Sequence, residues 1–268
     1  MKLPLNTDLT GKTVVITGAG GVLGGMFAKA LAQAGGKVAL LDLNQEAAEK
    51  AAKEISEEGY IAKGYAANVL QKESLAAAHE QIKKDFGLCD ILINGAGGNN
   101  PKATTDQEYY VPGELKEGEK SFFDLEQSGV EFVFNLNFIG TLLPTQEFAQ
   151  DMLEKEGCNI INISSMWGTS GASCEVAYSA TKSGIHGLTR ALAKELAPSN
   201  IQVNAIACGV IDTEMNGRLN EEERQDLMDE IPSGRFADPE EVAELALKLT
   251  DTPAYMTGQI IGIDGGFI

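Results

Sequence analysis

The sequence predicts an α/β fold in which one parallel β-sheet carries helices on both faces. Two observations support this fold class. Short segments rich in β-branched residues alternate with helical segments, and the first short segment leads into a glycine-rich turn. Such alternation is typical of doubly wound parallel sheets. The 268 residues are 43% hydrophobic and contain no linker or repeat, so we expect a single domain over residues 1–268.

The elements are assigned in order along the chain. The expected strands cover residues 13–17, 37–41, 61–67, 91–94, 159–164, 202–207 and 260–263. The expected helices cover residues 25–34, 45–58, 72–85 and 176–196.

Two segments interrupt this alternation. Residues 97–130 are long, polar and rich in turn residues, and residues 213–232 are charged and helix-prone. Both follow ends of expected strands, where such sheets bind ligands. We therefore expect a long substrate-side loop and a substrate lid, with a surface elaboration that has no role in binding as the alternative.

The composition argues against several classes of partner. The net charge is −18 and the pI is about 4.5, so the chain repels nucleic acid and anionic membrane surfaces. No apolar segment is long enough to cross a membrane, and the first residues lack the apolar core of a signal peptide, so we expect a cytoplasmic protein. The four cysteines form no CxxC pair, and we expect no metal site.

The glycine-rich turn predicts a dinucleotide site. It runs from Gly18 to Gly25, directly after the first expected strand and before the first helix. Glycines let the backbone approach a pyrophosphate, and the helix start offers free N–H donors. The second strand leads to Asp42, eighteen residues after Gly24. A carboxylate there accepts hydrogen bonds from ribose hydroxyls and repels a 2′-phosphate, which favours NAD(H) over NADP(H). The alternative is that Asp42 only caps the helix that begins at Gln45.

Tyr178 and Lys182 predict proton transfer. They are four residues apart and share one face of an expected helix. A phenol with a pKa of about 10 is a poor acid or base, but a nearby ammonium favours the phenolate. Ser165, thirteen residues before Tyr178, follows a strand-like run and can hold a substrate oxygen. A solvated helix face is the alternative for the tyrosine–lysine pair alone.

In combination, these motifs resemble the short-chain dehydrogenase/reductase family over essentially the whole chain. The family's order is kept: the glycine turn, Asn94-Gly95-Ala96-Gly97, Asn137, Ser165, Tyr178 with Lys182, and the run 208–213. The resemblance implies a Rossmann-type enzyme with four catalytic residues. It implies that Tyr178 is the general acid/base and that Ser165 holds the substrate oxygen. It implies that Lys182 binds the nicotinamide ribose and lowers the pKa of Tyr178. Asn137 would link Lys182 to a proton relay through a water molecule.

The resemblance also implies the cofactor contacts. These are Gly18, Gly21, Val22, Leu23, Asp42, Asn68, Val69, Asn94, Ala96, Gly97, Tyr178, Lys182, Gly209, Ile211 and Thr213. Four positions depart from the family's usual residues, with Val22 for Gly, Asn68 for Asp, Gly95 for Asn and Cys208 for Pro. Asn68 keeps a side-chain carbonyl. Val22 adds bulk beside the expected pyrophosphate.

The substrate expectation comes from the middle of the chain. Residues 94–144 and the run 161–166 resemble the D-mannonate oxidoreductase (fructuronate reductase) branch, which implies a sugar-acid substrate. The chain from Cys208 onward resembles 3-oxoacyl-carrier-protein reductases and gluconate 5-dehydrogenases, which stay open as alternatives, as does an NAD(H)-sensing protein without turnover. A sugar acid needs cationic or multi-donor partners for its carboxylate. The candidates are Asn99, Asn100, Lys102 and Arg218, with Met166 and Trp167 as an apolar wall. Solvated surface charges are the alternative for Lys102 and Arg218.

The expected partners are a small carbonyl or alcohol substrate and further copies of the chain. The run 262–267 resembles the end that packs between subunits in tetramers of the family. The expected helix over 176–196 is apolar on more than one side, as a helix in a subunit interface is. Both features imply a homotetramer.

Overall fold

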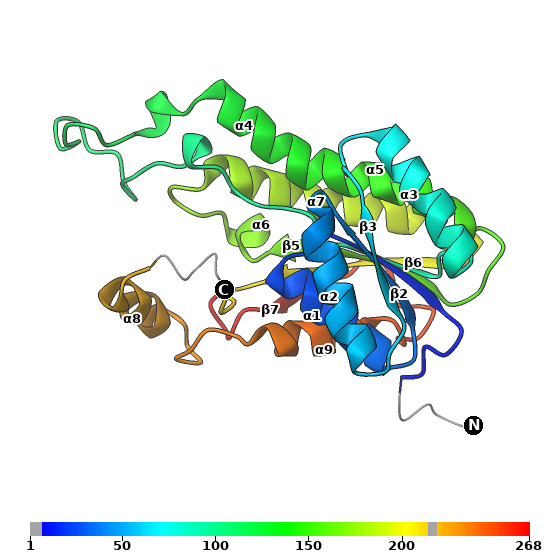
Figure 1. The fold of residues 1–268 in the computed structure, drawn as a ribbon. Helices are drawn as coiled ribbons and strands as arrows, with labels where there is room; N and C mark the ends of the chain where they lie inside the picture. The colour runs from blue at the N-terminus through cyan, green and yellow to red at the C-terminus, as the bar shows by residue number, and fades with distance from the viewer. Residues whose placement is uncertain (1–6, 214–218) are drawn as a thin grey trace.

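The protein forms a seven-stranded, entirely parallel sheet with helices on both faces (Figure 1). The structure, a computed structural model, describes residues 7–213 and 219–268. The strand order is β3-β2-β1-β4-β5-β6-β7. The strands are β1 (Thr13–Thr17), β2 (Lys37–Asp42), β3 (Ala62–Ala66), β4 (Ile91–Asn94), β5 (Cys158–Ser165), β6 (Ile201–Cys208) and β7 (Ile260–Ile263). The predicted doubly wound fold of one domain is confirmed.

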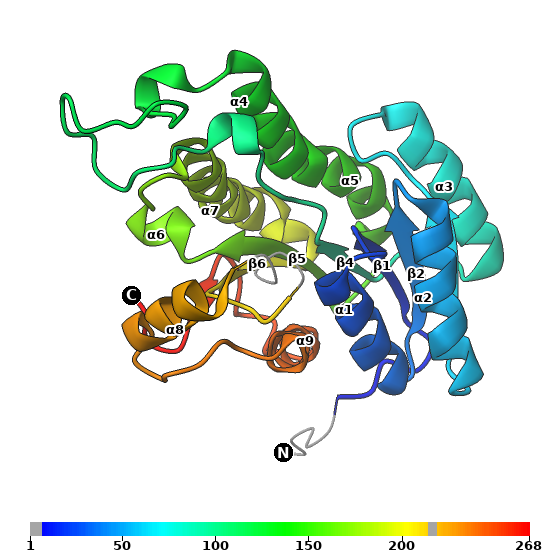
Figure 2. The same ribbon diagram turned by 60° about the vertical axis from the view of Figure 1, so that its left-hand side comes forward.

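The helices form two layers (Figure 2). Helices α1 (Val22–Gln33), α2 (Gln45–Glu57) and α9 (Pro239–Leu249) cover one face, and α3 (Lys72–Asp85), α5 (Gly140–Phe148) and α7 (Val176–Leu196) cover the other. Side chains of a strand alternate between the faces. Thus Val14 and Ile16 of β1 enter the first core, and Val15 enters the second. Two cores on one sheet leave its carboxyl edge free for a site.

Two predicted boundaries are wrong. The first helix begins at Val22, three residues before the predicted start, because Gly24 and Gly25 lie inside it. Residues 127–130, predicted as the end of the long loop, form the first turn of α4 (Gln127–Phe134). The Glu126 carbonyl accepts hydrogen bonds from the Gly129 and Val130 N–H groups at 3.0 and 3.1 Å, which starts that helix.

The rest of the long loop extends from the body of the molecule beside α4 and α7 (Figure 1). It contains two short 3₁₀ turns, η1 (Pro101–Ala103) and η2 (Phe122–Asp124). Its base is fixed to α4, because the Glu126 N–H donates to the Lys102 carbonyl at 2.9 Å. In the predicted lid, residues 221–230 form α8 (Glu221–Glu230). Residues 214–218, including the candidate Arg218, lie outside the described residues.

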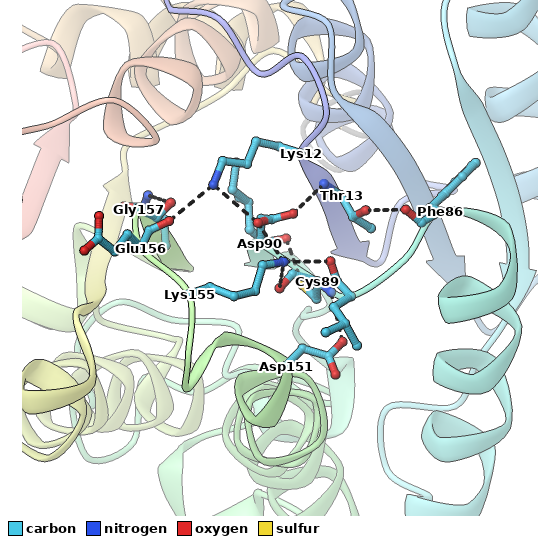
Figure 3. Close-up of polar contacts among 12 residues, drawn as sticks. Lys12, Thr13, Phe86, Cys89, Asp90, Asp151, Lys155, Glu156 and Gly157 are labelled. Atoms are coloured by element: carbon cyan, nitrogen blue, oxygen red, sulfur yellow. Dashed lines mark hydrogen bonds and ion pairs between the residues drawn. The ribbon is translucent and has the colours of Figure 1, made fainter.

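Charged side chains also meet at the opposite, amino edge of the sheet (Figure 3). The carboxylate of Asp90, just before β4, accepts a hydrogen bond from the Thr13 N–H at 2.9 Å. It also pairs with Lys155 at 2.7 Å and with Lys12 at 3.3 Å. We call Lys12, Asp90 and Lys155 the amino-edge cluster. It joins the starts of β1 and β4 to the segment before β5.

Two negative observations concern the described residues only. None of the helices in residues 7–213 and 219–268 combines the length and the apolarity needed to cross a bilayer. The same residues contain no group of three or more His, Cys, Asp or Glu side chains placed to hold a metal ion.

The smaller helical elements complete the chain. They are the π-helical turn η3 (Asn135–Ile139), α6 (Trp167–Ser170) and the 3₁₀ turns η4 (Ala149–Met152) and η5 (Ala197–Ser199). The π-helical turn separates α4 from α5 and places Asn137 in the protein interior, with 1% of its surface exposed.

Candidate active site

A cavity of about 340 Å³ opens at the carboxyl edge of the sheet, across the strands β1, β4, β5 and β6. The strand order reverses between β1 and β4, the position at which such sheets bind ligands. The predicted site residues that line the cavity are Gly18, Gly21, Val22, Leu23, Gly97, Ser165, Tyr178, Lys182, Gly209, Ile211 and Thr213. Segments that are distant in sequence therefore meet at one place.

The glycine turn fits a dinucleotide pyrophosphate. Gly18 has a φ of +67°, and a Cβ there would lie 2.8 Å from the Ala96 Cα, so only glycine fits. Gly21 precedes α1 without a side-chain cap, and residues 21–24 line the cavity, so the start of the helix offers free N–H donors beside it. The Val22 side chain lines the cavity but is 44% exposed, so its bulk does not close the helix start.

Asp42 shapes this turn from the end of β2. Its Oδ2 accepts a hydrogen bond from the Gly20 N–H at 2.9 Å, and its Oδ1 accepts one from the Asn44 N–H at 2.9 Å. Asn44, not Asp42, caps α2 through the Ala47 N–H, so the capping alternative for Asp42 is wrong. Each Asp42 oxygen keeps a second acceptor position for a ribose hydroxyl.

Five predicted contacts lie outside the cavity lining. Asp42, Asn68 and Val69 follow the ends of β2 and β3, beside one another and on the side of the turn away from Tyr178. The Asn68 Oδ1 already accepts a hydrogen bond from the Leu70 N–H at 2.9 Å. The Asn94 amide is buried and donates to Thr145 and Asn162, so only its backbone can face a ligand. The fifth is Ala96.

Thr17 positions the turn after β4. Its hydroxyl oxygen accepts hydrogen bonds from the N–H groups of Gly95 and Ala96, at 3.1 and 3.2 Å. The same turn continues to Gly97, where a Cβ would lie 2.8 Å from the Asn137 Oδ1 and 3.4 Å from the Lys182 Nζ. The missing side chain at Gly97 therefore lets the two catalytic candidates approach each other.

The π-helical turn explains how Asn137 is held. Its Nδ2 donates to the carbonyls of Val133 and Gly98 at 2.8 and 2.7 Å, and its Oδ1 accepts from the Gly98 N–H at 3.2 Å. A π turn displaces carbonyls from the regular helical ladder, and π turns are frequent at functional sites. The Asn137 amide satisfies one such carbonyl and fixes the start of the long loop.

Lys182 is buried, with 5% of its surface exposed. Its Nζ donates to the Ile163 carbonyl at 3.0 Å and lies 5.4 Å from the ring centre of Tyr178. Ser164 fixes the backbone of α7 at the same level, because its hydroxyl donates to the Lys182 carbonyl at 3.3 Å. Burial lowers the pKa of Lys182 to about 8, although the Cys208 thiol acts in the opposite direction.

Tyr178 and Ser165 both line the cavity and are joined by a hydrogen bond. Burial raises the pKa of Tyr178 first, the nearby Glu175 and Cys208 raise it further, and the hydrogen bond with Ser165 lowers it. The Lys182 Nζ lies close to the Tyr178 ring, and the lowering of this pKa by its charge together with that of a bound nicotinamide stays a prediction. The Tyr178 ring also packs against Ala103 of the long loop and Val133 of α4.

The candidates for a substrate carboxylate are not gathered at the cavity. Lys102 forms an ion pair with Glu126 at 2.8 Å, and its side chain is 57% exposed. Asn100 caps the turn η1 through the Lys102 N–H. Met166 is buried and does not line the cavity. Trp167 packs edge-on against Phe267 with ring centres 5.3 Å apart.

Sequence reasoning missed several residues of the site. Thr17 holds the turn after β4 through its hydroxyl, and Ile163 holds Lys182 through its backbone carbonyl. No sequence motif reveals either contact. Cys208 lines the cavity, and burial raises the pKa of its thiol to about 12, while Lys182 lowers it. Glu175 lies one helical turn before Tyr178, and this spacing is visible in the sequence. The remaining missed lining residues are Gly24, Gly95, Gly98 and Ser164.

Comparisons with known proteins agree with this geometry. The short chain dehydrogenase family matches residues 12–224. An oxidoreductase of Haemophilus influenzae, itself uncharacterised, is 48% identical and covers 100% of this chain and 96% of its own length. A 3-oxoacyl-[acyl-carrier-protein] reductase of Aquifex aeolicus is 38% identical over 98% of this chain and 99% of its own.

A crystal structure from Haemophilus is similar over the whole fold. That protein was provisionally assigned as a D-mannonate oxidoreductase and was crystallised with bound NAD. It superposes with a TM-score of 0.93 at 47% identity, covering 97% of this chain and 96% of the other. The chain belongs to the short-chain dehydrogenase family and is an oxidoreductase.

Proposed function

We propose that the protein is an NAD(H)-dependent oxidoreductase that interconverts a secondary alcohol and a ketone, with D-mannonate and D-fructuronate as the substrate pair. One observation carries the reaction class. The uncapped glycine turn opens into the same cavity as Ser165, Tyr178 and Lys182. A dinucleotide held at the turn therefore has its reactive end beside a proton donor.

A bound nicotinamide supplies the hydride for reduction, or accepts it in oxidation. During reduction the Tyr178 hydroxyl gives its proton to the carbonyl oxygen, which Ser165 holds by a hydrogen bond. Lys182 binds the ribose hydroxyls and favours the phenolate that remains. Because burial lowers the pKa of Lys182 to about 8, we propose that the positive charge of the oxidised cofactor completes this stabilisation. Asn137 connects Lys182 to a proton relay.

The sugar-acid assignment is supported by the Haemophilus structure and by the sequence of the long loop. Asn99 and Asn100 lie at the start of that loop, directly after Gly98 of the cavity. A 3-oxoacyl-thioester reductase is the second candidate, favoured by the Aquifex relative. The net charge of −18 weighs against it, since an acidic carrier protein needs a basic docking surface.

A screen of carbonyl substrates tests the function. NADH oxidation is followed with D-fructuronate, tagaturonate, 5-ketogluconate and an acetoacetyl thioester. We expect kcat/KM for fructuronate to exceed the other values at least about tenfold, the gain from one well-placed charged hydrogen bond. A preference for the thioester would contradict the sugar-acid assignment, and NADH binding without turnover of any ketone would support the NAD(H)-sensing alternative.

The preference for NAD(H) over NADP(H) is tested at Asp42. We expect NADH to bind more tightly than NADPH, because the carboxylate repels a 2′-phosphate. The dissociation constant for NADPH divided by that for NADH should fall by about tenfold or more in Asp42→Ser, because one close charge is removed. Tighter binding of NADPH by the unchanged protein would overturn the argument.

A homotetramer, a cytoplasmic location, a substrate-side loop over 97–130 and a lid over 213–232 belong to the same proposal. The resemblance of the run 262–267 to subunit-packing ends supports the tetramer. Light scattering tests it against the chain mass of 28.5 kDa. A particle of one chain mass would contradict it.

A further inference from the structure

Glu175 carries a carboxylate that none of the roles described above explains. It is the N-cap residue of α7, three residues before Tyr178, and its charge acts on Tyr178. The residue is partly buried, yet its carboxylate makes no cap for α7. Within the described residues its hydrogen-bond partner is the neutral Asn99, whose Nδ2 donates to Oε1 at 3.1 Å, and no ion pair includes it.

The backbone before Glu175 is held in an unusual conformation. Cys174 has a φ of 65°, in the left-handed region that residues with a side chain rarely adopt. Its carbonyl accepts a hydrogen bond from the Thr105 N–H at 3.1 Å. The long loop therefore holds this segment twice, through Thr105 and through Asn99. Such conformations persist only where the surroundings impose them, and they are concentrated at functional sites.

The groups that face Tyr178 come from five elements, three of which contribute polar groups. Lys182 approaches from the same helix, Ser165 from β5 and Cys208 from β6, while Ala103 and Val133 contribute apolar contacts. Among these neighbours, Glu175 and Cys208 oppose the phenolate, and Ser165 favours it. Burial raises the pKa of Glu175, and the hydrogen bond from Asn99 lowers it. Glu175 thus acts on Tyr178 in the sense opposite to Ser165.

We propose that Glu175, held by Asn99 and by the turn at Cys174, is a positioning residue whose charge sets the pH at which Tyr178 passes from proton donor to proton acceptor. The inference rests on the proposed oxidoreductase function. In reduction the Tyr178 O–H bond breaks, its proton joins the substrate oxygen, and the carbonyl carbon receives the hydride from NADH. Oxidation runs the same exchange backwards, with NAD⁺ as the oxidant. When the Tyr178 hydroxyl ionises at a higher pH, it can donate its proton over a wider pH range. The pH optimum of alcohol oxidation then moves to a more alkaline value.

Glu175→Gln tests the proposal, because it removes the charge and keeps an acceptor for Asn99. The pH profiles of ketone reduction and of alcohol oxidation are measured for this variant and for the wild type. We expect the midpoints of both pH profiles to move to lower pH by about one pH unit. This is the effect of one charge about one helical turn away. Below the midpoint, oxidation should then be about tenfold faster than in the wild type.

Glu195→Gln is the matched control, since Glu195 is an exposed carboxylate at the end of the same helix. It should leave both midpoints unchanged. Reduced activity of Glu175→Gln with unchanged midpoints would overturn the proposal, because Glu175 would then only hold the loop. Equal shifts of the pH midpoints in Glu175→Gln and Glu195→Gln would also overturn the proposal.

A readout without cofactor separates this inference from the proposed function. Tyrosinate absorbance is measured at the highest pH at which the variants stay folded by circular dichroism. Glu175→Gln should show more tyrosinate than the wild type, and the difference should vanish when Tyr178→Phe is added to both. Equal absorbance would overturn the inference even in an active enzyme. A difference in a protein that reduces no ketone would overturn only the proposed function.

Discussion

The two edges of the sheet both carry buried charge, but the partners of that charge differ; Figure 3 shows those at the amino edge. At the amino edge, the Asp90 carboxylate has a backbone N–H and two lysines as partners. Burial raises the pKa of Asp90, yet the hydrogen bonds and charges of Lys155, Thr13 and Lys12 outweigh it, and the pKa is lowered. At the carboxyl edge, Lys182 donates to one carbonyl, and no carboxylate of the described residues forms an ion pair with it.

The difference separates a structural cluster from a chemical one. A buried charge whose partners are all present fixes the strands that carry them. A buried charge without a counter-charge costs stability and is retained where function needs it. The pKa of Lys182, lowered to about 8 by burial, records that cost. The comparison predicts that variants at the carboxyl edge lose activity, whereas variants at the amino edge lose stability.

The largest expected effect is that of Lys182→Met. It removes the proposed ribose ligand and the charge beside Tyr178, so kcat/KM should fall by about 10³-fold. The free energy of unfolding should stay the same or rise, because an apolar side chain replaces a buried charge without a counter-ion. Steady-state kinetics and chemical denaturation measure the two effects.

Lys155→Met is the matched control for Lys182→Met at the other edge. It should lower the free energy of unfolding by about 1 kcal/mol, the contribution of one charged hydrogen bond, and leave kcat near the wild-type value. The comparison fails if Lys182→Met unfolds the protein or if Lys155→Met abolishes turnover.

The effect expected for Asp90→Asn is smaller than that of Lys182→Met on kcat/KM and larger than that of Lys155→Met on the free energy of unfolding. The two lysines lose their counter-charge but remain partly exposed, so we expect a loss of about 2 kcal/mol at neutral pH. The pKa of Asp90 is lowered in the folded state, so its stabilisation is present above the unfolded value of about 3.9 and is lost as the pH falls through the lower folded value. The unfolding free energies of variant and wild type should begin to converge as the pH falls below ~4 and should meet below the folded pKa of Asp90. A constant difference down to the acid transition would show that charge is not the cause.

The smallest effect is expected for Lys102→Ala. Because Lys102 is exposed and paired with Glu126, its removal should change the KM for fructuronate by less than about twofold, as for most surface ion pairs. A tenfold increase that is absent with a neutral ketone would restore Lys102 as the carboxylate ligand. The comparison would then need a third region, in the long loop.

The sequence predicts most of the fold, because the strands are short β-branched runs whose pattern is local. The helical spacing of Tyr178 and Lys182 and the glycine turn also identify the catalytic edge. Local patterns do not reveal the amino-edge cluster, since Lys12, Asp90 and Lys155 are far apart in the chain and meet only after the strands pair.

The features that the sequence did not reveal have the same origin. Lys102 was predicted near a ligand because of its charge, but its partner Glu126 becomes a neighbour only when the long loop returns to α4. The π-helical turn around Asn137 depends on the backbone of Gly98, which comes from another segment. Glu175 is one turn from Tyr178 in the sequence, but its burial and its contact with Asn99 require the folded loop.

The most direct test of the account is Tyr178→Phe, which removes the proposed proton donor and little else. We expect NADH to bind within about twofold of the wild type, measured by fluorescence, because the glycine turn and Lys182 remain. The turnover of fructuronate should fall by about 10²–10⁴-fold, the usual contribution of a positioned acid. More than about a tenth of the wild-type activity in this variant would contradict the central claim, because another group would then transfer the proton.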